Sequence, residues 1–457
     1  MFTSGLKKIA SLTGAVAILL ASSCRVTEAN EVAAVQKQAA SATKRETRGI
    51  PSDRLIVQLT KDADQEKFSD LLNEVHGTLI KTLEFGPGVS FLIIQTEPGT
   101  VAAVEEQFRK DRDIRSVERN VICQTSDLAI PEHELLRSAR VGHLHKSISH
   151  LHGGKHALPP NDPLFPVEWD LQMLNYPAAR TSQVGQATAS VLVPMYFCDT
   201  GVDYQPPEIG VGAMQFNCFD PPNSTGVQEY LFDSGSHGSG TTAVTAATDN
   251  KIGLSGAANF ESNRIELVMC RITNGGINTA TVEGILTGLN FIYLASWLTP
   301  GPINVSVQSA PPNTLNSLLS IQTAAQQLRQ KGFLVVLAAG NSAAYDSSPE
   351  LYARRVLALS GNGMRASFSN YGPFQGAAPG DQVPIYVPGS VAELFGSGTS
   401  FAAPRWCAAV AVVMAALPPN FRTAPIADAI VFATATNTAE GYKVPDMQAA
   451  IPSAASY

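Results

Sequence analysis

Near its C-terminus the chain contains Gly396-Ser-Gly-Thr-Ser400-Phe-Ala-Ala-Pro404, and an apolar run from Trp406 to Leu417 follows it. Glycines let the backbone turn sharply and let another segment approach closely. The pattern therefore predicts a buried helix that begins beside Ser400 and presents its hydroxyl at the first turn. The free amides and the dipole at such a helix start favour negative charge. A turn that only caps a core helix is the alternative.

A nucleophilic serine needs a base, because its hydroxyl is a poor nucleophile while it keeps its proton. His237 is the only histidine after residue 156, and it lies in Gly235-Ser-His-Gly-Ser-Gly240 before a predicted helix. Asp199 follows a predicted buried strand and is expected to orient the imidazole. Asn341 also follows a strand, and its amide is a candidate oxyanion donor together with the Ser400 amide. Each of these residues taken alone is also typical of a turn, a cap or a core position.

Four motifs in this order resemble those of the subtilisin-like serine proteases: Asp199-Thr-Gly-Val, Ser236-His-Gly-Ser, Ala338-Ala-Gly-Asn341 and Gly398-Thr-Ser-Phe-Ala-Ala-Pro404. The order Asp, His, Ser matches subtilisin and differs from the orders in chymotrypsin and the α/β-hydrolases. A G-x-S-x-G elbow is absent from the sequence, which argues against a lipase or esterase.

The resemblance implies a three-layer α/β fold with a mostly parallel sheet and a secreted serine endopeptidase for protein or peptide substrates. By this resemblance, Ser400 would attack the scissile carbonyl, and His237 would act as base and then as acid. Asp199 would orient His237, and Asn341 would stabilise the oxyanion. The substrate would lie as an extended strand along Ser306, Val307 and Gln308. A catalytically silent scaffold or binding protein of the same fold is the alternative function.

The resemblance also suggests a structural calcium ion. Asn250, in Asp249-Asn-Lys-Ile-Gly-Leu254, resembles the calcium loop of the family, and Asp162 is similar to a ligand in thermitase-like members. A plain turn is the alternative. No CxxC spacing indicates a zinc site.

Three departures from the family pattern stand out. Gly240 occupies the place of a second histidine, and Arg405 stands where a histidine usually follows the proline. Gln308-Ser309 replaces the usual Gly-Gly, which is expected to alter the substrate-binding edge.

The N-terminal residues 1–23 are predicted to be a signal peptide, because Lys7 and Lys8 precede an apolar stretch too short to span a bilayer. Leu20-Ala-Ser-Ser-Cys24 resembles a bacterial lipobox. A lipid anchor at Cys24 and plain secretion, extracellular or periplasmic, are the alternatives. Residues 24–52 are predicted to be a flexible leader.

Residues 53–124 are predicted to form a small α+β, ferredoxin-like domain, with strands at 54–59, 89–95 and 114–124 and helices at 63–76 and 101–109. It resembles the inhibitory propeptide of the family, which implies a self-inhibited zymogen. Residues 125–160 hold six of the eight histidines and are predicted to be a linker cut during maturation, with a metal tract as the alternative.

Residues 161–457 are predicted to be the peptidase domain, with alternating strands and helices. One of its strands is expected to begin after Pro194, because proline cannot donate in a ladder.

The composition is that of a globular protein, with 44% hydrophobic and 16% charged residues. A net charge of -7 and the lack of a basic patch exclude a nucleic-acid partner. Cys198, Cys270 and Cys407 lie in apolar runs and are predicted to be buried thiols, while Cys123 and Cys218 are candidates for pairing. We expect a monomer.

Overall fold

The computed structural model describes residues 53–125, 162–182, 193–203, 214–218, 233, 237–248, 251, 253–258, 265–273, 279–309, 314–386 and 394–457. These residues all belong to one compact unit of the chain, Pro51–Tyr457. The predicted signal peptide, leader and nearly all of the histidine-rich linker lie outside the described residues.

A seven-stranded sheet forms the centre of the fold, in the order β14-β13-β12-β10-β6-β8-β7. Every neighbouring pair is parallel, which confirms the predicted α/β class. The strands are β14 (Ala377–Pro379), β13 (Arg354–Leu359), β12 (Leu334–Ala338), β10 (Pro302–Val305), β6 (Val193–Asp199), β8 (Ile265–Arg271) and β7 (Met214–Asn217).

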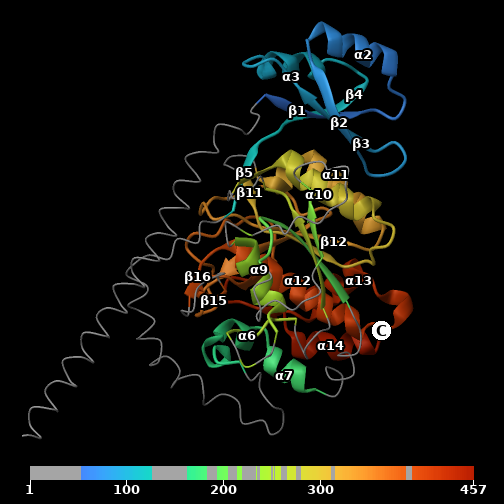
Figure 1. The fold of residues 1–457 in the computed structure, drawn as a ribbon. Helices are drawn as coiled ribbons and strands as arrows, with labels where there is room; N and C mark the ends of the chain where they lie inside the picture. Colours follow the sequence, from blue (N-terminus) through green and yellow to red (C-terminus); the bar gives the residue numbers. More distant parts are fainter. Residues whose placement is uncertain are drawn as a thin grey trace, which may run out of the picture. The chain divides into compact units, whose positions relative to one another are not determined.

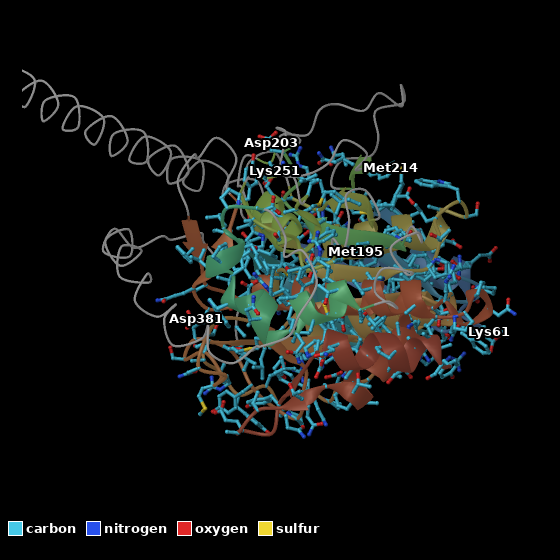
Figure 2. All side chains as sticks on the ribbon, turned by 90° about the horizontal axis from the view of Figure 1, so that it is seen from below. Lys61, Met195, Asp203, Met214, Lys251 and Asp381 are labelled. Carbon is cyan, nitrogen blue, oxygen red and sulfur yellow. The ribbon has the colours of Figure 1, made fainter. Side chains whose placement is uncertain are left out.

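Helices cover both faces of this sheet. One face packs against α9 (His237–Ala246), α12 (Thr399–Ala416), α13 (Ala424–Thr434) and α14 (Met447–Ala455), and the other against α10 (Val282–Leu294) and α11 (Leu319–Gln330) (Figure 1). Alternation along β6 shows how one strand serves both faces. Met195 and Phe197 join the first core, whereas Tyr196 and Cys198 join the second. Figure 2 shows Met195 among the side chains of the interior, while Lys61 and Asp381 lie at the periphery.

The prediction that β6 begins after Pro194 is wrong, because β6 runs through it and pairs with β8 from Val193 onward. The carbonyl of Pro194 faces Gly301, where a Cβ would lie only 2.3 Å from that oxygen. The nitrogen of a strand residue points to the same side as its own carbonyl. On that side the pairing with β10 starts only at Tyr196, so the missing donor costs no ladder bond.

The N-terminal residues form a second sheet, in the order β2-β3-β1-β4, with every neighbouring pair antiparallel. Its elements are β1 (Arg54–Leu59), α2 (Gln65–Glu74), β2 (Thr78–Glu84), β3 (Ser90–Gln95), α3 (Val101–Arg109) and β4 (Ile114–Arg119). Phe68 of α2 and Phe108 of α3 pack over the sheet with their ring centroids 6.1 Å apart. The observed order β-α-β-β-α-β is that of a ferredoxin-like domain, although the sequence pattern predicted no strand over the β2 segment.

The predicted strand at 114–124 divides into two. β4 stays in the N-terminal sheet, whereas β5 (Ile122–Gln124) lies between β9 (Thr279–Thr281) and β11 (Gln308–Ser309) in a three-stranded antiparallel sheet. Asn120 marks the change: its amide donates to the Arg54 carbonyl, and its side-chain oxygen accepts from Glu283 N at 2.9 Å. The chain therefore leaves one sheet and enters another within two residues.

The remaining elements are short, and they complete the described part of the chain. They are α6 (Trp169–Met173), α7 (Tyr176–Thr181), β15 (Val383–Ile385), β16 (Leu394–Gly396), β17 (Thr436–Asn437) and β18 (Lys443–Val444), with 3-10 turns at Phe165–Val167, Leu315–Ser317 and Pro419–Phe421.

Five cysteines lie in the described residues, and all five are buried free thiols: Cys123, Cys198, Cys218, Cys270 and Cys407. The suggestion that Cys123 and Cys218 could form disulfide bonds is therefore wrong. Within the described residues one helix, α12, is long and apolar enough to cross a membrane, but 94% of it is buried inside the protein. It is the core helix expected after Ser400.

Candidate active site

Three neighbouring strands of the central sheet end at the candidate site. Asp199 is the last residue of β6, Ser306 follows β10 directly, and Asn341 lies three residues past β12. Because the carboxyl ends of parallel strands share one edge of a sheet, these residues from distant parts of the sequence lie close together.

Asp199 and His237 are in direct contact. Nδ1 of the imidazole lies 2.7 Å from Asp199 Oδ1, and both side chains are 0% exposed. The carboxylate also accepts hydrogen bonds from Thr200 N at 2.7 Å and from the Thr241 hydroxyl at 3.0 Å. Because a carboxylate can only accept, Nδ1 must carry the proton in this pair. Nε2 is therefore left as the basic atom of the ring.

A second carboxylate holds the start of α9, whose first residue is His237. Asp233 accepts from Ser239 N at 2.6 Å and from the Thr200 hydroxyl at 2.7 Å, and Thr200 in turn accepts from Gly238 N at 2.8 Å. Burial raises the pKa of Asp233, and the charge of Asp199 raises it further, while hydrogen bonds from Thr200 and Ser239 oppose both effects. This network caps the helix that carries the imidazole.

Gly238 is needed for that contact, since a Cβ at this position would lie 2.0 Å from the carbonyl oxygen of Gly201. The segment after Asp199 and the first turn of α9 are thus pressed backbone against backbone. This close approach explains the glycine that follows the histidine in the motif.

Ser400 lies in the first turn of α12 and is 2% exposed. Its hydroxyl donates to the Ser306 carbonyl at 3.1 Å, and the Ser306 hydroxyl donates to the Ser400 carbonyl at 2.9 Å. Pro404 explains why that carbonyl is available, because proline has no N–H to donate to the residue four positions earlier. The ring of Phe401, the next residue, lies 6.4 Å from the imidazole of His237.

Asn341 is anchored to the same first turn. Its Oδ1 accepts from Thr399 N at 2.8 Å and from the Thr399 hydroxyl at 2.9 Å. A backbone N–H requires an acceptor, so this contact fixes the orientation of the amide and leaves Nδ2 as its donor.

The backbone before Asn341 takes an unusual conformation. Gly340 has a φ of +102°, which residues with a side chain rarely adopt. Asn370 holds the loop, because its side-chain oxygen accepts hydrogen bonds from Ser342 N at 3.0 Å and from Ala344 N at 2.9 Å. No pattern in the sequence predicted this role of Asn370. Thr200, Asp233 and Thr241 were also missed, since a polar residue near a turn has no distinctive signal in one sequence.

The predicted substrate edge, Ser306 to Gln308, lies beside these groups. Ser306 contacts Ser400, Val307 is buried, and Gln308 pairs with Gln124 of β5. The side-chain oxygen of Gln308 accepts from Asn341 N at 2.5 Å. An extended segment of the chain itself therefore lies on the edge proposed for substrate.

Two glutamates hold the N-terminal residues against the helices that follow. Glu283, at the start of α10, contacts Arg54 at 2.8 Å and Lys81 at 2.9 Å, and it accepts from Asn120. In the other direction, Glu118 of β4 accepts from Leu319 N at 2.6 Å and from Ser320 N at the start of α11. Carboxylates are favourable at such helix starts.

The predicted calcium ligands do not form a described metal site. Asn250 lies outside the described residues, and the oxygens of Asp162 accept from Lys251 N at 2.8 Å and from the Ser255 hydroxyl at 2.9 Å. A calcium ion needs six to eight oxygen ligands. In the described part of the chain, no three His, Cys, Asp or Glu side chains gather where a metal could bind. Asp162 thus contacts protein donors, and its role as a calcium ligand stays a prediction.

Arg405, one of the departures from the family pattern, is a buried structural residue. Its guanidinium contacts Asp170 at 2.5 Å, and both side chains are 1% exposed. It also donates to the Phe401 carbonyl at 2.9 Å, which is one turn earlier in α12. The arginine therefore ties the helix that carries Ser400 to α6.

The fold defines the class of protein. A solved structure of proteases from Pseudoalteromonas arctica PAMC 21717 matches with a TM-score of 0.53 at 23% identity, covering 65% of this chain and all of that chain. With its parallel sheet between two helical layers, the protein has the three-layer α/β fold of subtilisin-like proteins.

Sequence comparison gives the family. The model of the Subtilase family matches residues 197–449, more than half of the chain, so the chain belongs to that family. It is 29% identical over 257 residues to Alkaline protease from Alkalihalobacillus alcalophilus, and the match covers 54% of this chain but only 59% of that relative. It is also 29% identical over 256 residues to Subtilisin Savinase from Lederbergia lenta, a match that covers 54% of this chain and 84% of that relative.

Proposed function

We propose that this protein is a serine endopeptidase that works through an acyl-enzyme intermediate formed on Ser400. One observation carries the proposal: a buried imidazole held by a carboxylate lies at the same sheet edge as a serine and an amide donor. The 2.7 Å contact between His237 and Asp199 is the centre of that arrangement. Membership of the subtilase family supports the same activity.

The geometry supports a separate catalytic role for each of these residues. Asp199 holds Nδ1–H of His237, so that Nε2 takes the proton when the Ser400 oxygen attacks the scissile carbonyl. The resulting oxyanion is stabilised by Asn341 Nδ2 and by the Ser400 amide, which lies in the first turn of α12. His237 then gives its proton to the leaving amine, and water reverses the sequence to release the acid product.

We further propose that the protein is synthesised as a self-inhibited precursor, with residues 53–124 as its propeptide. The support is the position of β5, which pairs with Gln308 and Ser309 where a substrate strand would lie. A peptide substrate and β5 cannot occupy one edge together. Cleavage within residues 125–160 would then free the peptidase domain, 161–457.

We propose secretion as a monomer, with lipidation at Cys24 as the alternative, on the basis of the predicted signal alone. A structural calcium ion near Asp162 and Asn250 rests on the family resemblance alone.

The experiment is to compare Ser400→Ala with Ser397→Ala, a matched change three residues away at an exposed serine that bonds to Asp381. We expect the Ser400→Ala protein to lose casein hydrolysis, labelling by a fluorophosphonate probe and release of its N-terminal domain. The Ser397→Ala protein should keep all three.

Each opposite outcome has a definite meaning. If purified Ser400→Ala still cleaves casein or loses its N-terminal domain, Ser400 is not the nucleophile. If the processed wild-type protein takes up no probe and cleaves nothing, the protein is the silent scaffold considered as the alternative.

A further inference from the structure

The side chain of Gln308 bridges the substrate edge and the oxyanion loop. Its Oε1 accepts from Asn341 N at 2.5 Å, and a Cβ placed on Gly340 would lie 3.0 Å from the same oxygen. The side chain therefore extends from β11 as far as the backbone of Gly340 and Asn341. Its chain of methylenes occupies the space between the two segments.

The pairing of β5 shows how a peptide residue would face this side chain. Gln308 lies opposite Gln124 in an antiparallel ladder, so a strand in the place of β5 that continues in register has its second following residue opposite Ser306. The Ser306 carbonyl accepts the Ser400 hydroxyl at 3.1 Å. The peptide residue opposite Ser306 is therefore the one whose carbonyl lies next to the nucleophile.

Alternation decides where the side chain of that peptide residue points. Residues two apart on a strand share a face, and residues opposite each other share it as well. The peptide residue opposite Ser306 thus projects on the same face as Gln308. The hydrogen bonds of Ser306 to Ser400 and of Gln308 to Asn341 show that this face is the one toward α12 and the oxyanion loop.

We propose that Gln308 is a specificity-determining residue, which restricts the peptide residue on the acyl side of the cleaved bond to small side chains such as glycine, alanine or serine. The inference rests on the proposed function, since it concerns the substrate of the same site. A large side chain would have to displace Gln308 and would leave the Asn341 N–H without its acceptor, which is unfavourable for a partly buried polar group.

The test expresses the full chain, lets it mature, and uses the processed protein with two tetrapeptide p-nitroanilides, Ala-Ala-Pro-Ala and Ala-Ala-Pro-Phe. We expect the wild-type protein to have at least a tenfold higher kcat/KM for the alanine substrate. Gln308→Gly should raise the Phe-to-Ala ratio at least tenfold. The ratio is the readout, because loss of the bond to Asn341 would lower both rates alike. Gln308→Glu keeps the size and the acceptor and should keep the wild-type ratio.

The outcomes separate the two proposals. If the wild-type protein hydrolyses the phenylalanine substrate as fast as the alanine one, the inference is wrong while the proposed function stands, and no variant is needed for this result. An unchanged ratio in a folded Gln308→Gly protein also overturns it. If neither these substrates nor casein are hydrolysed, the proposed function itself fails and the inference with it.

Discussion

At the scale of single residues, buried carboxylates organise the site around His237. Asp199 contacts the imidazole, and Asp233 contacts the backbone that carries it, with Thr200 bonded to both carboxylates. The second carboxylate reaches the imidazole only through the backbone of α9. Its effect on catalysis should therefore be one of position.

We predict that Asp233→Ala lowers kcat at least tenfold, or about 1.4 kcal/mol in the barrier, because the helix start that holds His237 loses its cap. The cap itself is worth about 1 kcal/mol of stability. Asp446→Ala is the matched control, since Asp446 caps α14 through Ala449 N at 3.0 Å. Thermal unfolding and steady-state kinetics should show both variants destabilised and only Asp233→Ala slowed. Equal kcat values in the two variants would contradict the positioning role.

The buried pair of Arg405 and Asp170 leads to a second prediction at this scale. Arg405→Met should destabilise the fold by about 3–5 kcal/mol, because it leaves the Asp170 carboxylate buried without a counter-charge. Asp170→Leu added to Arg405→Met should restore most of the loss. Guanidinium unfolding in a Ser400→Ala background, which prevents self-digestion, measures both. Equal stability of the single and double variants would mean that the pair is not the cause.

At the scale of secondary-structure elements, α10 and α11 begin at the contact with the N-terminal sheet. Each helix start meets a carboxylate, Glu283 within α10 and Glu118 from β4. Burial raises the pKa of Glu118, while hydrogen bonds from Ser320 and Leu319 oppose this effect. A carboxyl whose pKa is raised on folding adds stability below its ordinary pKa and loses it as pH rises through the raised value.

We therefore predict that Glu118→Gln gains thermal stability relative to the unsubstituted protein as pH rises from about 4 to about 7. The measurement is Tm across this range in the Ser400→Ala background. Glu106→Gln is the control, because the hydrogen bond from Lys110 lowers the pKa of the exposed Glu106, and its sign is opposite. A difference in Tm that does not change with pH would show that Glu118 does not ionise in this range.

The elements also show what one sequence could predict. Strands such as β12 and β13 were predictable because they are short apolar runs. The histidine at the start of α9 was predictable because His237 is the only histidine after residue 156. β5 was missed as a separate strand, since its partners β9 and β11 lie more than 150 residues further along. The same limit applies to Asp233 and Asn370, whose roles depend on contacts that only the fold creates.

At the scale of the whole molecule, packing without cross-links holds the described residues together. Two apolar cores lie on either side of the central sheet, and buried thiols belong to both. Burial raises the pKa of Cys123 to about 12, so this thiol is unreactive in the folded state.

We predict that a reducing agent leaves Tm unchanged and that the five cysteines of the described residues react with a thiol reagent only after denaturation. A chain of this length buries enough apolar surface in its cores to be stable without disulfide bonds. Calorimetry with and without reductant, followed by mass spectrometry of labelled thiols, is the measurement. A fall in Tm on reduction would reveal a disulfide bond.

The position of β5 between β9 and β11 limits which segments of a substrate protein the proposed endopeptidase can cleave. In the proposed maturation β5 leaves this sheet, and β9 and β11 then lie apart with a gap one strand wide between them. Only an extended backbone segment fits such a gap, so helices and compact turns of a substrate protein must first unfold locally. The cleavage sites would then lie in the segments of the substrate protein that unfold locally most often.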